Sequence, residues 1–321
     1  MHLKNGLAIV LMSICSTSFA ENYYWGFNPE TKKFGFSNQS GEKVTFKEAF
    51  LGANGITPKK NVVTATKTEN SSSIVLNTLN ATELLPALFG QRQVNRGSNS
   101  SELKFPFIAM QQSIDGEKQL RYIQQHPTMT YQNVQNQPRY FVFLESIPTI
   151  GTDVNSCHGC YVKGYLLNFK KNPNGTFELT NPKTKLVDIP SSYGESHLKI
   201  SDIQKGLQRV GQNAVGSIFE TGFTSGGATT SLFELLVLQD QDVTIKRVGD
   251  AGVFGTRYIE AKDREYEYGY EGKYKILTTE PNAELYPIQI SYSGTDWSLK
   301  KKNNSIIQKY NAATGSYPEY E

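Results

Sequence analysis

Short apolar runs, separated from one another by glycine, asparagine or charged residues, are the feature that most restricts how this chain can fold. Runs of about four to eight residues bounded by turn residues are typical of β-strands, and Tyr140–Leu144 and Ala214–Glu220 are examples. Long stretches with helical spacing of apolar residues are rare. We therefore predict a mainly β fold, or an α+β fold with few helices, in which hairpins build antiparallel sheets within one or two domains.

Several of these runs flank turn residues and therefore predict hairpins. The turn Pro173-Asn174-Gly175 separates two such runs, and a glycine-rich turn that contains Gly226 and Gly227 separates two others. Aromatic residues on both sides of a polar turn predict a further hairpin near the N-terminus. The predicted hairpins and additional strands cover residues 23–36, Tyr161–Thr180, Ala214–Leu238, Val243–Val248 and Tyr286–Tyr292.

Three segments favour short helices, and each is followed by a glycine that suits a helix end. The first is Thr45–Leu51. The second is Thr82–Phe89, with Asn80 as its cap and Pro86 inside, so this helix should be short or broken. The third segment, Ser201–Val210, fits two interpretations: a helix throughout, or a helix that gives way to a strand.

Residues 1–20 have the three parts of a secretory signal peptide. Lys4 gives a basic start, Gly6–Cys15 is an apolar stretch, and Ser18 and Ala20 suit cleavage after residue 20. The apolar stretch is too short to span a membrane. We predict export to the periplasm, or alternatively to the extracellular space, with no transmembrane segment in the mature chain.

A change in composition predicts a division of the chain near residue 138. Residues 91–138 contain ten glutamines, and the Gln/Asn-rich run Gln124–Pro138 is typical of a linker or a long surface connection. After the signal peptide at 1–20, we therefore expect an N-terminal region at 21–138 with mixed strands and short helices. An antiparallel β domain at 139–321 should contain both remaining cysteines.

The net charge argues against a nucleic-acid-binding protein, and the hydrophobic content argues against a disordered chain. The chain has 33 Lys plus Arg and 30 Asp plus Glu, a net charge of +3, which gives little affinity for the phosphates of nucleic acid. Hydrophobic residues make up 38% of the chain, enough to offset the entropy that folding costs. The protein is therefore expected to be folded and not to bind nucleic acid.

Cys157-His158-Gly159-Cys160 is the most unusual motif of the sequence. After removal of residues 1–20, Cys157 and Cys160 are the only cysteines, and an even number in an exported protein favours a disulfide. Haem attachment needs a histidine directly after the second cysteine, whereas Tyr161 stands there. The motif therefore predicts a structural disulfide that fixes a local turn.

Redox and metal chemistry are the alternatives for this motif. A thiol–disulfide site places its first cysteine at the start of a helix, but Tyr161–Leu167 has the pattern of a strand. A zinc ion would need two further ligands, and His126, His158 and His197 are the only histidines after residue 20. We therefore predict neither a metal nor another cofactor.

The motif and the residues after it resemble a group of exported bacterial proteins with no assigned function. In that group a Cys-His-Ala-Cys motif precedes a strand and a Trp-containing return, whereas Gly159 and Phe177 stand at the Ala and Trp positions here. The resemblance covers roughly residues 140–321. It implies export and a disulfide between Cys157 and Cys160, and it implies no activity. The matching segments are Cys157–Phe169, Tyr286-Pro287-Ile288, Gly294-Thr295 and Tyr310–Tyr320.

Residues 265–276 alternate in character, as expected of a strand or of a hairpin bent near Gly269 or Gly272. One face is expected to carry Tyr266, Tyr268, Tyr270, Tyr274 and Ile276, and the other Glu265, Glu267, Glu271, Lys273 and Lys275. We expect the tyrosines to form the buried side of an amphipathic strand. Alternatively they form a stacking platform for sugars, since tyrosine has an apolar body and a polar tip.

Three glutamates, Glu145, Glu220 and Glu234, end or interrupt apolar strands and are candidates for the acid and base of a glycosidase. Nothing in the sequence brings any two of them together. His197 follows Glu195 and Ser196, but a Ser-His pair adjacent in sequence does not assemble a triad. No catalytic residue is therefore predicted.

These observations favour an exported, non-catalytic binding or accessory protein: an inhibitor, a toxin-neutralising protein or a protein that binds the cell envelope. Its partner would be another protein or an envelope glycan, and His158 and the four tyrosines are its candidate binding residues. The alternative is an enzyme, either a thiol–disulfide protein that uses Cys157 and Cys160 or a carboxylate-based hydrolase of envelope polysaccharide.

Overall fold

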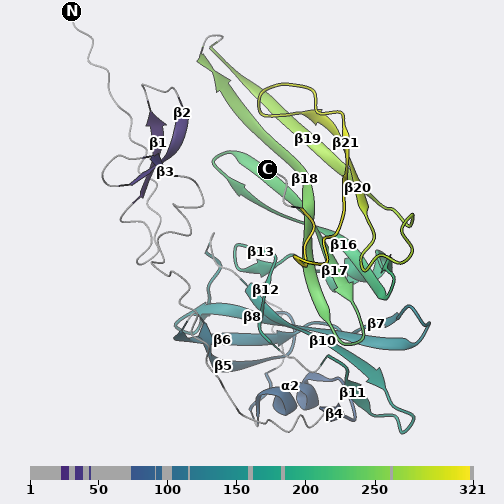
Figure 1. Ribbon diagram of the computed structural model, residues 1–321. Helices are drawn as coiled ribbons and strands as arrows, with labels where there is room; N and C mark the ends of the chain where they lie inside the picture. Colours follow the sequence, from purple (N-terminus) through teal and green to yellow (C-terminus); the bar gives the residue numbers. More distant parts are fainter. Residues whose placement is uncertain are drawn as a thin grey trace, which may run out of the picture. The chain divides into compact units, whose positions relative to one another are not determined.

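The structure is a computed structural model that divides the chain into two units, Met1–Glu69 and Asn70–Glu321 (Figure 1). Each unit is described by itself. In the first unit, the structure describes the backbone of three strands. In the second, it describes residues 74–90, 92–95, 103–114, 116–157, 162–181, 185–260 and 263–318.

The first unit contains a small antiparallel sheet of β1 (Tyr23–Asn28), β2 (Lys33–Asn38) and β3 (Lys43–Val44), in that order. Strands β1 and β2 pair along their whole length, which confirms the hairpin predicted for residues 23–36. The signal peptide at 1–20 and the helix expected at Thr45–Leu51 lie outside the described residues, so both stay predictions.

The second unit begins with a nine-stranded antiparallel sheet. Strands β4, β11, β10, β8, β6 and β5 follow one another across it, while β7 and β9 pair with β8 and β12 pairs with β10. The strands are β4 (Val75–Leu76), β5 (Phe107–Ile114), β6 (Glu117–Gln125), β7 (Met129–Gln132), β8 (Pro138–Ile150), β9 (Asp153–Val154), β10 (Val162–Lys171), β11 (Phe177–Leu179) and β12 (Val187–Ile189).

Helix α2 (Ala81–Phe89) lies against one face of this sheet and confirms the helix predicted at Thr82–Phe89. Its Leu84 and Leu85 are fully buried in a cluster with apolar residues of β5, β6, β8 and β10. Asn80 is the N-cap residue, but its side chain makes no capping hydrogen bond. The helix ends at Gly90, whose φ of 82° favours glycine.

The structure divides the chain at a different place from the boundary predicted near residue 138. Strand β8 begins at Pro138 and pairs with both β6 and β7, so residue 138 lies inside the sheet. Two buried glutamines of this stretch donate to or accept from backbone groups. Gln125 Nε2 donates to Leu79 O at 2.7 Å, and Gln124 Oε1 accepts from Phe105 N at 3.2 Å.

The rest of the second unit is a seven-stranded antiparallel sheet in which sequence neighbours are also spatial neighbours. Its strands are β15 (Gln208–Gly211), β16 (Ala214–Ser225), β17 (Ala228–Leu238), β18 (Val243–Ile259), β19 (Arg264–Ile276), β20 (Ile288–Thr295) and β21 (Ser305–Gln308). The hairpin β13 (Ser191–Ser192) with β14 (Glu195–Ser196) and the helix α3 (Ile200–Lys205) precede it. Helix α3 followed by β15 agrees with the second interpretation of Ser201–Val210.

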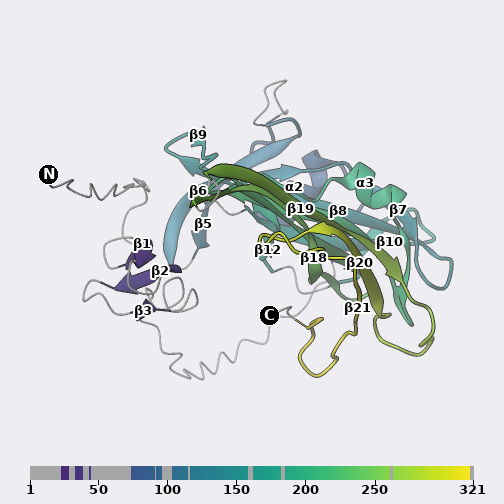
Figure 2. The same ribbon diagram turned by 90° about the horizontal axis from the view of Figure 1, so that it is seen from above.

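The two sheets meet at one end of the seven-stranded sheet (Figures 1 and 2). A shared core cluster joins Phe141 and Phe143 of β8 to Phe219 of β16 and Leu236 of β17. A second cluster, which includes Phe233 and Ile290, belongs to the seven-stranded sheet and to the loops that cover it. The mainly β fold with antiparallel sheets built from hairpins, expected from the short apolar runs, is thus confirmed.

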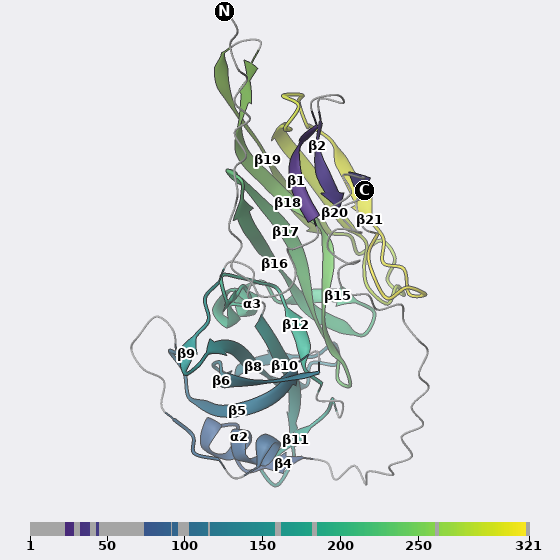
Figure 3. The same ribbon diagram turned by 90° about the vertical axis from the view of Figure 1, so that its left-hand side faces the viewer.

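Strands β18 and β19 continue past their neighbours (Figure 3). Strand β17 pairs with β18 only as far as Gly255, and β20 pairs with β19 only as far as Gly269. Among the described residues, Gly255–Ile259 and Arg264–Tyr268 pair with each other, and only Gly255 also pairs with another strand, at Ala228 of β17; we call these residues the two-stranded ribbon. A ribbon of two strands has no further strand beside it to support its faces.

Two close approaches explain glycines at the base of the ribbon. A Cβ atom on Gly255 would lie 2.6 Å from Tyr268 Oη, and one on Gly269 would lie 2.5 Å from Phe254 Cδ1. Each aromatic ring thus covers a glycine of the neighbouring strand, an arrangement that stabilises glycine in sheets. The alternation of tyrosine and glycine in this region follows from these contacts.

Candidate functional site

The predicted tyrosine face lies on β19, which is one continuous strand and not a bent hairpin. Tyr266, Tyr268 and Tyr270 stand opposite Arg257, Gly255 and Val253 of β18, with no register shift between them. Directly opposite residues in antiparallel strands share a face. One face therefore carries these tyrosines with Arg257 and Arg264, and the other carries Glu265, Glu267 and Glu271.

The tyrosine side chains are not buried as expected. Tyr266, Tyr268 and Tyr270 are half-buried, and Tyr274 is 37% exposed. For Tyr266 and Tyr268 the reason is the length of the ladders, because the ribbon extends beyond the strands that would support it, whereas Tyr270 and Tyr274 have β20 beside them. Only the C-terminal part of β19 joins the core, where the ring of Tyr274 packs at 5.3 Å from that of Phe233.

Cationic side chains lie over these rings. The Arg264 guanidinium is 5.1 Å from the centre of the Tyr266 ring, and Lys302 Nζ is 3.6 Å from the centre of the Tyr270 ring. Arg257 lies 5.0 Å from the ring of Trp297, which is 62% exposed. We call this surface the aromatic–cationic face; it consists of Tyr266, Tyr268, Tyr270, Trp297, Arg257, Arg264 and Lys302.

A hollow of about 450 Å³ lies at the base of the aromatic–cationic face. It is lined by Tyr270, Asp296, Trp297, Lys301, Lys302, Asn303 and Asn304. Burial lowers the pKa of Lys302, while the charges of Asp250 and Asp296 oppose this shift. Half-exposed rings beside cations and amides suit a ligand with apolar faces, hydroxyls and negative charge.

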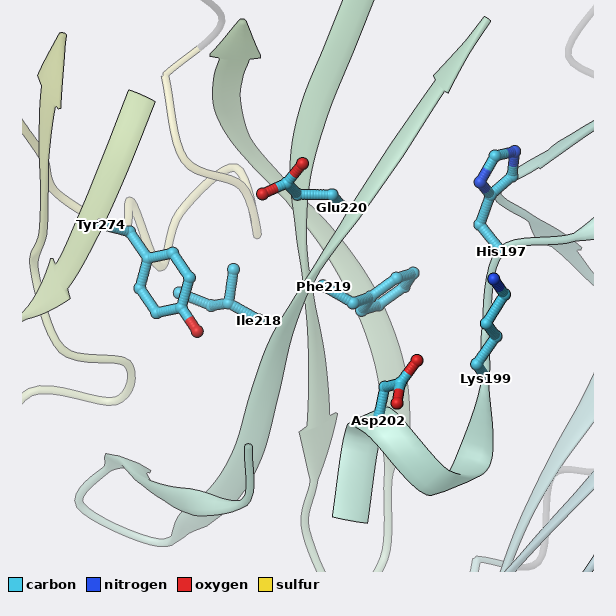
Figure 4. Close-up of a pocket in the computed structure, with 7 residues that line it drawn as sticks. All are labelled: His197, Lys199, Asp202, Ile218, Phe219, Glu220 and Tyr274. Atoms are coloured by element: carbon cyan, nitrogen blue, oxygen red, sulfur yellow. The ribbon is translucent and has the colours of Figure 1, made fainter. Parts of the chain in front are cut away.

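A second pocket, of about 340 Å³, lies elsewhere on the seven-stranded sheet (Figure 4). Figure 4 shows Tyr274 on one side of it and His197 and Lys199 on the other, with Glu220 of β16 between them. The remaining lining residues are Asp202, Ile218 and Phe219. Burial and the charge of Glu220 both raise the pKa of Tyr274. Tyr274 therefore belongs to this pocket as well as to the core edge.

His197 makes a local contact and not the triad considered from the sequence. Its Nε2 lies 2.8 Å from Ser192 Oγ within the β13–β14 hairpin. Ser196 bonds elsewhere, since its N–H donates to Glu145 Oε1 at 3.1 Å. Burial lowers the pKa of His197, Lys199 lowers it further, and Glu195 opposes both effects.

The three glutamates have separate surroundings. Glu145 is buried and its Oε2 lies 2.7 Å from Nε2 of His126, whose ring stacks on Phe143. Glu234 is also buried; burial raises its pKa, and Arg247, with Nε at 3.2 Å, opposes the shift. Glu220 is exposed at the second pocket. Among the described residues, no hydrogen bond joins any two of these glutamates.

Cys157 is exposed, and its backbone N–H donates to Asn155 Oδ1 at 3.2 Å. Its sulfur is engaged in a disulfide and does not titrate. The predicted partner Cys160 and the candidate residue His158 lie outside the described residues, so their roles stay predictions. The next described residue, Val162, begins strand β10, in agreement with the strand pattern after the motif.

Among the described residues, His, Cys, Asp and Glu side chains form no group of three or more that could hold a metal ion. Within the same ranges, no helix has the length and apolar character to cross a bilayer.

No family model, curated protein or solved structure matches this chain. The resemblance to exported Cys-His-x-Cys proteins therefore stays a prediction, and function has to be inferred from the residues themselves.

Proposed function

We propose that this chain is an exported, non-catalytic binding protein of the cell envelope. Its ligand is an acidic polysaccharide held on the aromatic–cationic face. The observation that carries the proposal is the half-exposed row of Tyr266, Tyr268 and Tyr270, which starts on the two-stranded ribbon and ends where β20 pairs with β19. Tyrosines whose only role was to anchor a sheet would be covered by a second layer.

The spacing of the rings supports an extended ligand. Successive tyrosines on one face of a strand are two residues apart, about 7 Å along the strand. A chain of sugars that runs along the ribbon would therefore meet one ring after another. Each ring offers an apolar surface for stacking and a hydroxyl for hydrogen bonding.

The distribution of charge supports an acidic ligand. Arg257, Arg264 and Lys302 lie beside the rings, while Glu265 and Glu267 point to the opposite face of the ribbon. An anion beside the rings would therefore meet these cations, and the glutamates of the ribbon lie on the far side; Asp296 is the carboxylate that lines the hollow at the base of the face. Cation–π contacts, each contributing about 0.5–1 kcal/mol at exposed sites, would also hold the rings in place.

The enzymatic alternatives have less support from the same residues. A glycosidase needs two carboxyl groups that flank one bond, but Glu145 and Glu234 have basic partners of their own, and Glu220 lies in a separate pocket. A thiol–disulfide enzyme needs an activated thiol at a helix start, and a strand begins two residues after Cys160.

The proposal is tested by affinity electrophoresis of the purified protein in gels that contain either polygalacturonate, an acidic polysaccharide, or dextran, a neutral one. We expect retardation by polygalacturonate that weakens as salt rises, because screening reduces attraction between exposed charges. Dextran should retard the protein much less. Equal retardation in both gels, or none in either, would contradict the proposal.

Charge variants of the ribbon provide the matched control. Arg257→Ala should weaken binding to polygalacturonate about tenfold, because the cation is lost and Trp297 loses its partner. Glu267→Ala, on the strand that faces Arg257 but on the opposite side of the ribbon, should bind at least as well as the wild type. If both variants lost binding equally, net charge and not the aromatic–cationic face would be responsible.

A further inference from the structure

Strand β16 has a free edge beside the second pocket. Strand β15 pairs with only Ala214–Gly216 of β16. From Ser217 to Ser225, no strand of the described chain pairs on that side, although β17 pairs along the whole length of the other side. An edge of this kind presents backbone groups that can pair with another chain.

Hairpin geometry determines which backbone groups point outward. Ser225 and Ala228 close a two-residue turn through Gly226 and Gly227, whose φ angles are 58° and 80°. The closing pair of such a turn exchanges hydrogen bonds, and every second residue along the strand repeats the pattern. The N–H and C=O groups of Phe219 therefore bond to β17, and those of Ile218 and Glu220 point to the free edge.

These outward groups lack backbone partners although they lie in a largely buried part of the strand. Ile218 is 6% exposed and Phe219 is 9% exposed. Among the described residues, no backbone–backbone hydrogen bond joins this edge to another segment. Ser217 Oγ contacts Ile218 O at 3.5 Å, which is at the limit for a hydrogen bond. Because buried backbone groups are almost always paired, the edge is suited to a ligand that supplies partners.

The second pocket opens on this edge. Ile218, Phe219 and Glu220 all line it, yet consecutive residues of a strand point to opposite faces. A pocket lined by three consecutive residues must therefore lie alongside the strand and not above one of its faces. The pocket thus gives access to the outward N–H and C=O groups of Ile218 and Glu220.

The side chains around the pocket indicate the kind of ligand. Lys199 and His197 provide basic groups on one side, while Asp202 and Glu220 provide carboxylates (Figure 4). Phe219 and Tyr274 add apolar surface. We propose that this edge binds a short extended peptide with free ends, which pairs with Ile218 and Glu220 as an added strand. Its α-amino group is bound by the carboxylates and its α-carboxylate by Lys199. Strand addition of this type is an established mode of peptide recognition.

The proposal is tested by titration calorimetry with the tripeptide Ala-Val-Ala. Methylation of the nitrogen of the third residue removes a backbone donor that would pair with the edge and should weaken binding at least tenfold, since strand pairing depends on it. N-acetylation of the peptide and the variant Glu220→Gln should each weaken binding severalfold. Lys199→Met should have the same effect, and C-terminal amidation should weaken binding of the wild type but not of that variant.

Amide hydrogen exchange gives an independent measurement on the wild-type protein. Saturating Ala-Val-Ala should slow exchange at Ile218 and Glu220 and leave Phe219, which already bonds to β17, unchanged. Glu267→Gln on the ribbon is the matched control and should bind the tripeptide like the wild type. Equal affinity for the parent and N-methylated peptides, or no binding at millimolar concentration, would overturn the inference. Neither result would affect binding of polysaccharide to the ribbon.

Discussion

The core part of the seven-stranded sheet and the two-stranded ribbon are both made of antiparallel strands but have opposite surroundings. In β17, Phe233, Leu235 and Val237 alternate with residues of the other face and are buried. In the ribbon part of β19, Tyr266 and Tyr268 alternate with glutamates and are half-exposed. The difference lies in what surrounds each strand: the core part of β17 has paired neighbours on both sides and a covering layer, and the ribbon has neither.

Period-two alternation in a sequence identifies a strand and its two faces, but it does not show which face is covered by other parts of the protein. Coverage depends on how far neighbouring strands extend, as the ends of the β17–β18 and β19–β20 ladders at Gly255 and Gly269 show. Tyrosine is suited to a covered face and to an exposed one, because its ring can pack while its hydroxyl stays in water.

The largest expected effect is in the core. Phe233 is 1% exposed and packs beside Tyr274, so Phe233→Ala should lower the free energy of unfolding by about 3–5 kcal/mol. Urea denaturation followed by circular dichroism measures this loss. If the free energy of unfolding fell by less than about 1 kcal/mol, Phe233 would contribute no more to stability than the ribbon tyrosines, and the contrast between the two regions would disappear.

An intermediate effect is expected where the ribbon joins the core. The ring of Tyr270 packs at 5.6 Å from that of Tyr292 and under the ammonium group of Lys302. Tyr270→Ala should therefore cost about 1–2 kcal/mol, less than a fully buried aromatic residue. The same urea titration measures it, and Tyr270→Phe, which keeps the ring, should cost only a fraction of that amount.

A small effect is expected on the ribbon itself. Tyr268 is half-exposed and covers Gly255, so Tyr268→Ala should cost no more than about 1 kcal/mol. The melting temperature would then shift by only a few degrees. If the cost approached that of Phe233→Ala, the tyrosines would be core residues after all and the ribbon would not be a free surface.

The smallest effect concerns the pH dependence of stability that arises from His197 in the second pocket. Because burial holds the pKa of His197 below its unfolded value near 6.5, the unfolded chain binds a proton more readily than the folded one. The contribution of His197 is therefore fully present above about pH 6.5 and is lost as pH falls through the folded pKa. His197→Gln should flatten the stability profile below pH 6.5. An unchanged slope would show that His197 is not held neutral.

Much of the fold could be predicted because its signals are local. The turns at Pro173-Asn174-Gly175 and Gly226-Gly227 contain residues that tight hairpins require, and the apolar runs on either side form the paired strands. Gly90 likewise ends helix α2. The predicted boundary near residue 138 falls inside the sheet, because glutamine content does not by itself identify a linker: Gln124 and Gln125 belong to β6 and bond to the backbone of Phe105 and Leu79.

The site could be predicted only in part, because its remaining residues come together through register. The sequence indicated the row of tyrosines, but nothing local places Arg257 opposite Tyr266 or brings Lys302 over Tyr270. The contact between His126 and Glu145 could not be predicted for the same reason, because it depends on the register of β6 against β8.

Affinity of Tyr268→Ala for polygalacturonate, measured by calorimetry on protein whose melting temperature is also recorded, tests the central claim most directly. The account predicts a protein that melts within a few degrees of the wild type and binds the polysaccharide at least tenfold more weakly. A variant that binds like the wild type, or one that loses binding only because it no longer folds, would contradict the claim that the exposed tyrosine row of the ribbon is the binding surface.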